Sequence, residues 1–434
     1  MTSIAFHTLG CKVNQYDTQA MLELFLQAGY TVVPFQENAD IYLINTCTVT
    51  GSGDKKSLQL ARKIKREHPS SFLILCGCMA QSRPDDLLKA GADLVLGTQR
   101  RMEVVSLTEQ AVRDGKALCA VQPVEGVTFF EPLQISSHAE HTRATLKIQE
   151  GCNGRCSYCI IPSVRGPIRS RLLRDICSEA DRLQNNGYRE LVLTGIHLSS
   201  YGRDLDNGTT LLDVLRALQE KPGILRIRLG SLEPTIMTDS FCRELKSIGK
   251  VCPQFHLALQ SGSDSVLKRM RRRYNTAQYL SAVHCLREAF PDAALTTDVL
   301  TGFPGETEQE FGETREFLNR IGFARIHVFP YSSRPNTPAA ELPCQLPAAE
   351  KESRARILIS DGQKMTQRWL ESWIGRVSSL LPEEIVNGHW EGYTPEYIRV
   401  RLEGNNTCES GKAVSVRLTG IESQRMKATL LNRI

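Results

Sequence analysis

The segment that decides the fold reads Gly151-Cys-Asn-Gly-Arg-Cys-Ser-Tyr-Cys-Ile160 and follows an apolar strand expected at Thr145–Ile148. Its thiols, Cys152, Cys156 and Cys159, have C-x3-C-x2-C spacing, which lets one loop wrap around a soft metal centre. Three cysteines on a four-iron cluster leave one iron open, and an open iron can hold the amino and carboxylate groups of S-adenosylmethionine (SAM). A structural zinc site is disfavoured because no nearby Cys or His supplies a fourth ligand.

Strand and helix patterns alternate on both sides of this loop, which indicates an α/β protein. Upstream, the pattern predicts a doubly wound parallel sheet with strands at Ile4–Thr8, Ile41–Asn45, Phe72–Cys76 and Asp93–Leu96. Downstream, six strand-and-helix units predict a (β/α)6 partial barrel with strands at Thr145–Ile148, Glu190–Leu193, Arg226–Leu229, Phe255–Ala258, Leu295–Val299 and Arg325–Val328. The chemistry of such a barrel lies at the carboxyl ends of its strands.

The chain changes character after the proline-rich stretch Pro335–Pro347. A long polar helix is expected at Ala348–Ile374. Short alternating segments then predict a small β-barrel with strands at Ile398–Leu402, Ala413–Leu418 and Lys427–Leu431. We therefore expect four parts: an N-terminal domain at 1–105, a connector at 106–142, the partial barrel at 143–365 and the small β-barrel at 366–434.

The composition is that of a globular protein, since 41% of the 434 residues are hydrophobic and 23% are charged. No run of about eighteen apolar residues could span a membrane, and the start of the chain lacks a signal-peptide pattern. We expect a cytoplasmic monomer. Fourteen cysteines are many for a reducing compartment, where structural disulfides are rare, so their clustering is informative.

Three further cysteines follow the ends of N-terminal strands: Cys11 in Thr8-Leu-Gly-Cys-Lys-Val-Asn-Gln15, Cys47 in Ile44-Asn-Thr-Cys-Thr-Val-Thr50, and Cys78 in Cys76-Gly-Cys-Met-Ala-Gln81. Because the carboxyl ends of parallel strands meet along one edge, these thiols can come together in space. Glycines beside Cys11 and Cys78 would let the backbone approach a bulky ligand. Spacing alone leaves two interpretations open, a second cluster or ordinary core cysteines.

The cysteine loop resembles that of the radical SAM superfamily. The wider stretch from Lys147 to Arg165-Gly-Pro-Ile-Arg-Ser-Arg171 is similar to the methylthiotransferase family within it, and the resemblance covers nearly the whole chain. It implies two 4Fe–4S clusters, a SAM-binding one on Cys152, Cys156 and Cys159 and an auxiliary, sulfur-carrying one on Cys11, Cys47 and Cys78. Cys78 stands in the family's Gly-Cys-x-Ala-Gln position, so we interpret Cys76 as a core residue.

Polar motifs at four successive strand ends support this resemblance: Leu193-Thr-Gly-Ile-His-Leu-Ser-Ser-Tyr-Gly202, Arg228-Leu-Gly-Ser-Leu-Glu-Pro234, His256-Leu-Ala-Leu-Gln-Ser-Gly262 and Thr296-Thr-Asp-Val-Leu-Thr-Gly-Phe-Pro-Gly-Glu-Thr307. Thr194 and Gly195 would let the amino end of a ligand approach the backbone. By resemblance, Ser231, Gln260 and Asp298 would lie near SAM or the reacting centre, although each also suits a strand-end cap. The chain departs from the family pattern at Gly230, where serine is common, and at Asn336, where glycine is common.

Basic residues frame the cysteine loop. Seven Lys or Arg residues stand against two acidic ones between Arg143 and Asp175, and Lys268-Arg-Met-Arg-Arg-Arg-Tyr274 adds five more. Such a surface suits a phosphate backbone, so we expect RNA contacts from Arg165, Arg169, Arg171, Lys268, Arg269, Arg271, Arg272 and Arg273. The basic helix expected at Lys55–Arg66 is interpreted as a solvated face.

The C-terminal barrel, with Gly392-Tyr-Thr-Pro-Glu-Tyr-Ile-Arg-Val400, resembles the TRAM domain, a small RNA-binding β-barrel. Its residues Tyr393, Tyr397, Arg399 and Arg401 either stack on bases and contact phosphates or are ordinary strand residues.

The start of the chain and Phe329-Pro-Tyr-Ser-Ser-Arg-Pro335 are most similar to the family branch acting on N6-threonylcarbamoyladenosine, immediately 3′ of the tRNA anticodon. The resemblance implies that a radical derived from SAM removes hydrogen from carbon 2 of the adenine and that a methylthio group replaces it. No side chain is expected to act as an acid or base. The implied partners are a tRNA anticodon stem-loop and a reductant such as flavodoxin or ferredoxin.

Two other functions remain open. A sibling enzyme of the family would act on isopentenyladenosine in tRNA or on an aspartate of a ribosomal protein. A non-catalytic iron–sulfur regulator would bind RNA without cleaving SAM, and it would have no need for four strand-end motifs.

Overall fold

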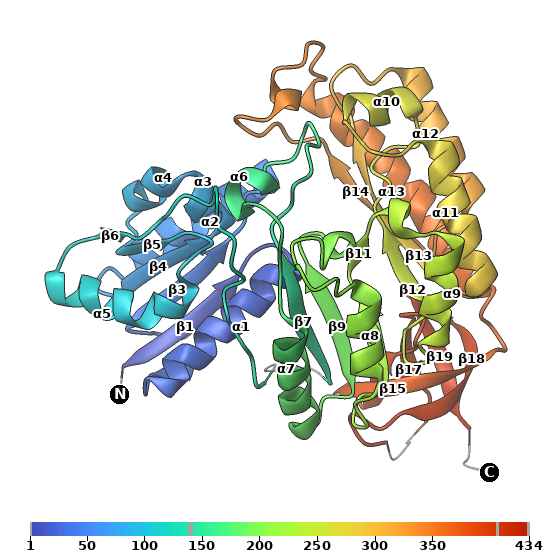
Figure 1. Cartoon of the computed structure of the whole chain (residues 1–434), viewed down its shortest axis with the longest axis horizontal. Coiled ribbons are helices and arrows are strands. Elements are labelled where there is room, and N and C mark those ends of the chain that lie inside the picture. Colours follow the sequence, from blue (N-terminus) through green and yellow to red (C-terminus); the bar gives the residue numbers. More distant parts are fainter. Residues whose placement is uncertain (1, 138–141, 405–407, 432–434) are drawn as a thin grey trace.

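The computed structural model describes residues 2–137, 142–404 and 408–431. Three bodies follow one another along the chain: a sheet domain, a partial barrel and a small closed barrel (Figure 1). Residues 138–141 of the expected connector, and 405–407 and 432–434 of the expected C-terminal domain, lie outside the described residues. In the part of the chain that is described, no helix combines the length and the apolar character needed to cross a membrane.

The N-terminal domain is an all-parallel sheet in the order β2-β1-β3-β4-β5-β6. Its strands are β1 (Ser3–Thr8), β2 (Thr31–Val33), β3 (Ile41–Thr46), β4 (Phe72–Gly77), β5 (Leu94–Leu96) and β6 (Leu118–Cys119). Central strands of a parallel sheet are apolar on both sides, so helices must cover both faces. One face carries α1 (Lys12–Gln27) and α5 (Val104–Asp114), and the other carries α2 (Gly51–Glu67), α3 (Cys78–Ser82) and α4 (Pro84–Lys89). The predicted doubly wound sheet is confirmed.

The central domain is the predicted partial barrel. Its six parallel strands are β7 (Arg143–Glu150), β9 (Glu190–Gly195), β10 (Arg226–Leu229), β12 (Gln254–Leu257), β13 (Ala294–Thr301) and β14 (Arg325–Pro330). The strands form two sheets, which the bridge between Ile227 and Val251 joins. The main helices that follow them are α7 (Leu173–Asn185), α8 (Leu211–Gln219), α9 (Asp239–Ser247), α11 (Thr276–Ala289) and α12 (Glu308–Ile321). A continuous apolar core fills the space between strands and helices.

The C-terminal domain is a closed barrel in the order β15-β16-β17-β19-β18. Its strands are β15 (Val377–Val386), β16 (His389–Tyr393), β17 (Arg399–Leu402), β18 (Val414–Glu422) and β19 (Arg425–Leu430). The helix α13 (Ala348–Glu371) precedes it and packs against β14 of the partial barrel. The boundary expected between residues 365 and 366 therefore falls inside one continuous helix.

Arginines of the partial barrel hold the small barrel in place. Arg226 donates to the backbone oxygen atoms of Tyr393 and Ser379, each at 2.8 Å. Arg143 lies over the ring of Tyr393, whose centroid is 4.4 Å from its guanidinium carbon. Tyr393 in turn stacks on Tyr397 with their ring centroids 4.6 Å apart. The two barrels thus meet through guanidinium–ring and guanidinium–carbonyl contacts.

A buried ion network joins the N-terminal domain to the partial barrel. It consists of three cations and three carboxylates, none exposing more than 7% of its side chain: Arg101, Lys147, Arg165, Asp17, Glu131 and Glu150. Asp17 of α1 accepts from Lys147 Nζ at 2.7 Å and from Arg165 Nη1 at 3.0 Å, and it also pairs with Arg101. Burying charge without partners is costly, so a placement of the two domains that pairs all six groups is favoured.

We expect Asp17→Asn to lower the free energy of unfolding by about 3–5 kcal/mol, because it leaves buried cations undercompensated. Urea unfolding under anaerobic conditions measures this change, as the free energy of the first unfolding transition. Glu67→Gln is the control, since Glu67 pairs with Lys63 and Arg66 on the exposed surface, and it should cost less than about 1 kcal/mol. Equal losses in the two variants would contradict the role given to the network.

Candidate active site

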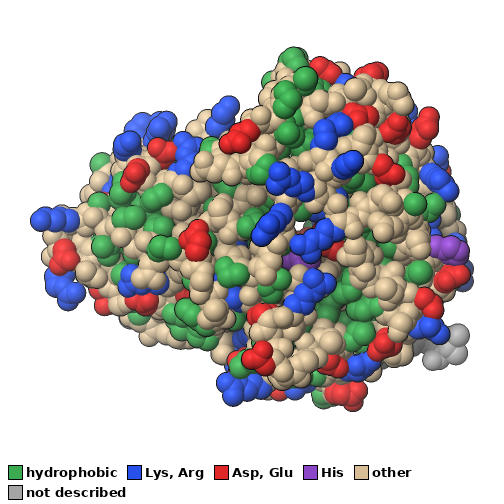
Figure 2. Space-filling view, turned by 45° about the horizontal axis from the view of Figure 1, so that its top comes forward, with side chains coloured by type: hydrophobic (Ala, Val, Ile, Leu, Met, Phe, Trp, Pro, Cys, Tyr) green, Lys and Arg blue, Asp and Glu red, His purple; other side chains and the backbone are tan. Residues whose placement is uncertain are grey.

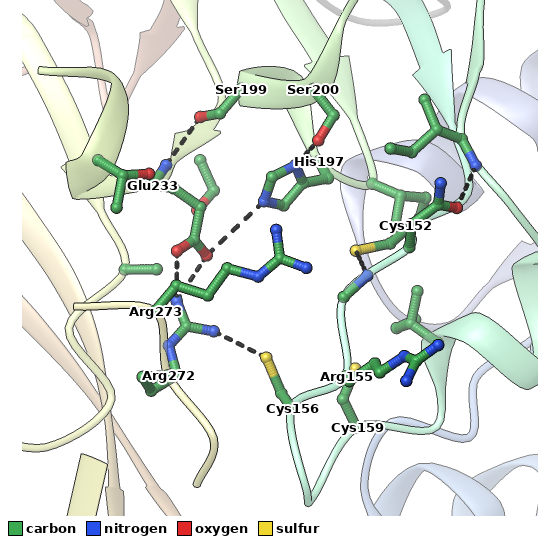
Figure 3. A pocket seen from close by; sticks show the side chains of 18 of the residues that line it. Cys152, Arg155, Cys156, Cys159, His197, Ser199, Ser200, Glu233, Arg272 and Arg273 are labelled. Carbon is green, nitrogen blue, oxygen red and sulfur yellow. Dashed lines mark hydrogen bonds and ion pairs between the residues drawn. The ribbon is translucent and has the colours of Figure 1, made fainter. Parts of the chain in front are cut away.

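A cavity of about 510 Å³ opens at the carboxyl ends of the barrel strands, and the cysteine loop lines it. Cys152 follows β7, whereas Cys156 and Cys159 precede the short helix α6 (Ile161–Arg165). Figure 3 shows the three cysteines on one side of the cavity, with Glu233 and Arg272 reaching toward them from the other. The predicted position of this loop, at the end of the first barrel strand, agrees with the structure.

Backbone geometry shapes the cysteine loop. Gly151 has a φ of +71°, and a Cβ there would lie 1.8 Å from the carbonyl oxygen of Pro167, so only glycine fits. Ser157 ties the loop to the next segment, since its backbone N donates to Met270 O at 3.0 Å and its Oγ donates to Arg269 O at 2.8 Å. The thiols are therefore held by contacts on both sides of the cavity.

The electrostatics of the three thiols suit a cationic metal group. Burial raises the pKa of Cys152, and it raises the pKa of Cys159 to about 12. A thiolate at Cys156 would raise both pKa values further, while Arg272 lowers them. Bound iron would stabilise the three thiolates together. Among the described residues, no three His, Cys, Asp or Glu side chains surround a single metal ion, and a four-iron cluster needs its thiols further apart than one ion does. The donor set and the cavity fit such a cluster.

Arg272 connects the cysteine loop to a polar chain across the cavity. Its Nη1 donates to Cys156 Sγ at 3.1 Å, and its Nη2 donates to Glu233 Oε2 at 2.7 Å. Its Nε donates to Tyr274 Oη at 3.0 Å, and its guanidinium lies over the ring of Tyr274. With these contacts made, the orientation of Arg272 is fixed before any ligand binds.

His197 lies at the far end of this polar chain. Its Nε2 is 3.8 Å from Glu233 Oε1, and its backbone N donates to Gln149 Oε1 at 2.6 Å. Burial lowers the pKa of His197; Glu233 opposes this effect, while Arg272, Arg203 and Arg273 strengthen it. The imidazole is therefore neutral at pH 7 and can both donate and accept a hydrogen bond.

Two of the five residues expected near SAM line the cavity, Ser231 and Gln260. Gln260 has a φ of +70°, and two backbone hydrogen bonds with β13 hold it in this strained conformation. Thr194 and Gly195 end β9, next to the cavity residue Ile196. Asp298 lies on β13, does not line the cavity, and has its carboxylate 3.4 Å from His256 Nε2. The SAM contacts of these five residues stay predictions.

The second cysteine set lies at the carboxyl edge of the N-terminal sheet. Cys11 precedes α1, Cys47 follows β3, and Cys78 begins α3. Gly10 has a φ of +108°, and a Cβ there would lie 3.0 Å from the Cβ of Cys47, so glycine allows this close approach. Burial, with contributions from Cys78 and Cys11, raises the pKa of Cys47 to about 11. The close approach of Gly10 to Cys47 and the neighbouring positions of β1, β3 and β4 place the three thiols at the same edge of the sheet. Cys76 is buried in the apolar core beside α1 and α5.

A direct contact joins the two cysteine sets. Cys78 packs against Ile160 and Val164, in the segment that follows Cys159, and α3 lies beside α6 (Figure 1). Arg165, at the end of α6, donates from Nε to Cys78 Sγ at 3.2 Å. Its charge lowers the pKa of this thiol, which burial raises. In space, the segment that follows Cys159 lies between Cys78 and the first cysteine set.

Three arginines predicted to contact RNA are buried instead. Arg165, Arg169 and Arg171 each expose at most 2% of their surface. Arg165 belongs to the ion network, Arg171 donates to Glu179 at 2.6 Å, and Arg169 donates to the carbonyl oxygen of Arg165 at 2.9 Å. The prediction for these three is wrong, because a basic sequence does not reveal which side chains meet buried carboxylates.

The segment around α10 (Asp264–Arg269) keeps part of the predicted basic surface. Lys268, Arg271 and Arg273 are exposed, and the last two line the cavity. Arg269 pairs with Glu310 at 2.8 Å, and Arg272 is occupied by its contacts with Cys156 and Glu233. RNA contacts in this segment stay predictions for the exposed residues.

The predicted RNA-binding residues of the small barrel also include one that contacts another domain and one that is exposed. Tyr393 is half-buried in the contact with the partial barrel, and its contact with RNA stays a prediction. Arg399 is exposed and pairs with Glu391 at 2.6 Å. Sequence alone could not place Tyr393, because the contact depends on Arg143 and Arg226 from another domain.

Among the Asp, Glu, Arg and His residues that line the cavity, five were not predicted: Arg155, His197, Arg203, Asp204 and Glu233. His197 and Glu233 belong to strand-end motifs already singled out in the sequence. Assigning every polar side chain of those motifs to the site would have found them. Arg155 stands within the cysteine loop itself.

Comparisons with known proteins agree with this architecture. Residues 146–318 match the Radical SAM superfamily, and residues 3–97 match the Uncharacterized protein family UPF0004. The structure of the radical S-adenosylmethionine methyltransferase TsrM from Kitasatospora setae shares the fold, with a TM-score of 0.60 at 13% identity. That match covers 78% of this chain and 77% of TsrM.

Full-length relatives are also similar. The threonylcarbamoyladenosine tRNA methylthiotransferases MtaB of Bacillus subtilis and Aquifex aeolicus are 40% and 39% identical. The first match covers 96% of this chain and 94% of the relative, and the second covers 95% and 99%. A tRNA-2-methylthio-N(6)-dimethylallyladenosine synthase of Acetivibrio thermocellus is 30% identical over 98% of this chain and 90% of its own. The predicted family is confirmed: the chain belongs to the radical SAM methylthiotransferases, in the group that contains the MtaB proteins.

Proposed function

We propose that this chain converts N6-threonylcarbamoyladenosine, adenosine 37 of tRNA, into its 2-methylthio derivative. One observation carries the proposal: Cys78 of the second cysteine set packs against Ile160 and Val164, next to the loop whose three cysteines line the cavity. A reaction that activates a carbon and delivers sulfur to it needs two such centres close together. The identity of 40% with the B. subtilis MtaB protein supports the choice of nucleoside.

As a radical SAM protein, the chain uses SAM and a 4Fe–4S cluster. We assign this cluster to Cys152, Cys156 and Cys159 and a second cluster to Cys11, Cys47 and Cys78. When bound, these groups supply the radical and the methylthio sulfur. The protein holds the reactants in place: Arg272 orients Cys156 and Glu233, Ser231 and Gln260 line the space for SAM, and the cavity walls limit access of water.

The proposed partners follow from the same cavity. Its mouth carries exposed arginines and would receive a tRNA anticodon stem-loop. The electron comes from a flavodoxin or ferredoxin. We place the reaction in the cytoplasm, with the protein acting as a monomer.

Deleting this protein from its cell is expected to abolish 2-methylthio-N6-threonylcarbamoyladenosine in bulk tRNA while the unthiolated nucleoside accumulates. Mass spectrometry of tRNA nucleosides measures both together. Expression of a Cys152→Ala variant should not restore the product, whereas the unaltered protein should. If the deletion instead removes the methylthio group from the dimethylallyl nucleoside, or only from a ribosomal-protein aspartate, the protein has the activity of a sibling enzyme and not the proposed one. If no product changes although RNA binds, the chain is a regulator.

Cys47→Ala is expected to lower the iron content from about eight to about four ions per chain. SAM cleavage should continue, because Cys152, Cys156 and Cys159 remain, while sulfur insertion should stop. Iron analysis and an assay for 5′-deoxyadenosine separate these effects. Cys76→Ala is the matched control, since its thiol lies in the core, and it should keep all the iron. An unchanged iron content in Cys47→Ala would refute the auxiliary site.

Arg272→Gln is expected to lower the reduction potential of the SAM-binding cluster on the order of tens of millivolts. Reduction adds negative charge near Cys156, so losing the cation 3.1 Å from its Sγ favours the oxidised form. A redox titration followed by electron paramagnetic resonance measures the shift. Arg272→Lys should shift the potential less, and Lys268→Gln, an exposed neighbour, should not shift it. An unchanged potential in Arg272→Gln would contradict this role.

A further inference from the structure

The cavity contains more cations than its own carboxylates can pair with. Five arginines line it, and Arg272 is the one with an ion-pair partner among the described residues, Glu233. The other four are exposed and come from three loops: Arg155, Arg203, Arg271 and Arg273. The second cavity carboxylate, Asp204, accepts from the backbone N and Oγ of Ser170 at 2.7 and 2.6 Å. Lys and Arg side chains gather around a hollow on this face of the molecule (Figure 2). The cavity therefore offers unpaired positive charge to a ligand.

Two of these arginines reach the same part of the cavity from different loops. Arg203 follows the 3-10 turn Leu198–Ser200 after β9, whereas Arg273 follows α10. Both arginines line the cavity together with His197, and the positive charge of each lowers the pKa of this imidazole. In Figure 3, Arg273 extends into the space between His197 and the cysteines. Among the described residues, its guanidinium group makes no hydrogen bond or ion pair. This placement leaves the guanidinium free to bind an anion inside the cavity.

We propose that Arg203 and Arg273 form a carboxylate-binding pair for the threonylcarbamoyl group of the substrate nucleoside, an inference that rests on the proposed function. The threonyl part of this group ends in a carboxylate, which carries a full negative charge at neutral pH. Guanidinium groups bind carboxylates through two parallel hydrogen bonds, and two arginines from separate loops can grip one carboxylate from both sides. A dimethylallyl group offers no charge to such a pair. The unpaired arginines would therefore favour the charged nucleoside over the apolar one.

Two other anions share this chemistry, a phosphate of the RNA backbone and the carboxylate of SAM. A phosphate would bind whatever group the adenosine carries, and SAM would bind without any RNA. The carboxylate of the modified nucleoside is distinguished from both, because its removal leaves the backbone and SAM unchanged.

The test uses the reconstituted holoenzyme with SAM and two anticodon stem-loop RNAs. One RNA carries N6-threonylcarbamoyladenosine, and the other carries the same group with a neutral amide in place of the carboxylate. We expect the unaltered enzyme to bind the first RNA about tenfold to a hundredfold more tightly. Arg203→Gln and Arg273→Gln should each reduce this ratio, and the double variant should bring it close to one through weaker binding of the carboxylate RNA alone. Arg113→Gln, an exposed arginine on α5 far from the cavity, is the control and should keep the full ratio.

Three outcomes would overturn the inference. Equal loss of affinity for both RNAs would assign the arginines to a phosphate. Weaker binding of SAM in the absence of RNA would assign them to the SAM carboxylate. A ratio that survives the double substitution would place carboxylate recognition elsewhere. Product formation by the unaltered enzyme on the first RNA separates this inference from the proposed function: if product forms, the three outcomes concern only the arginine pair, and if none forms, the proposed function itself fails.

Discussion

The arrangement of the whole molecule depends on the cost of burying charge. Asp17, Glu150 and Glu131 enter the contact between the N-terminal domain and the partial barrel, and each must meet a cation there. Arg165 satisfies two of these carboxylates and also donates to Cys78 Sγ at 3.2 Å. The same guanidinium therefore fixes the domain contact and a thiol of the second cysteine set. Because a packed ionic contact has few alternative arrangements, the distance between the two thiol triads is set by the fold rather than by ligand binding.

One arginine donates a hydrogen bond to a thiol of each cysteine set. Some of the basic residues in the sequence therefore contact buried groups and others stay exposed. Arg272 donates to Cys156 as Arg165 donates to Cys78. Hydrogen bonds and positive charge at thiolate sulfur stabilise the reduced, more negative state of a bound cluster. Much of the basic character around the cysteine loop thus serves the thiols and the domain contact. The predicted RNA contacts therefore concern the basic residues that the structure leaves exposed, such as Lys268 and Arg271.

The sequence predicted the features that local spacing determines and missed those that depend on a distant partner. The C-x3-C-x2-C loop and the six barrel strands lie where expected, since each is encoded in one short segment. The roles of Asn14 and Asp17 on the first helix were missed, because both look solvent-exposed in the sequence but face the domain contact. β15 was missed because Pro382 interrupts its pattern, and the strand accommodates this residue at an irregularity in its pairing with β16.

The charge balance of the cavity indicates the charge of the ligand that it binds. Glu233 is neutralised by Arg272, and Asp204, which accepts two hydrogen bonds from Ser170, is the one other carboxylate among the lining residues, so the remaining four arginines outnumber it. Water can solvate those arginines while the cavity is open. A ligand that excludes this water must replace it with negative charge, or the guanidinium groups lose their hydration without compensation. A substrate that brings an anion into the cavity meets this requirement, and a purely apolar one does not. The unpaired cations therefore favour substrates that carry negative charge, while the cavity walls favour substrates of matching shape.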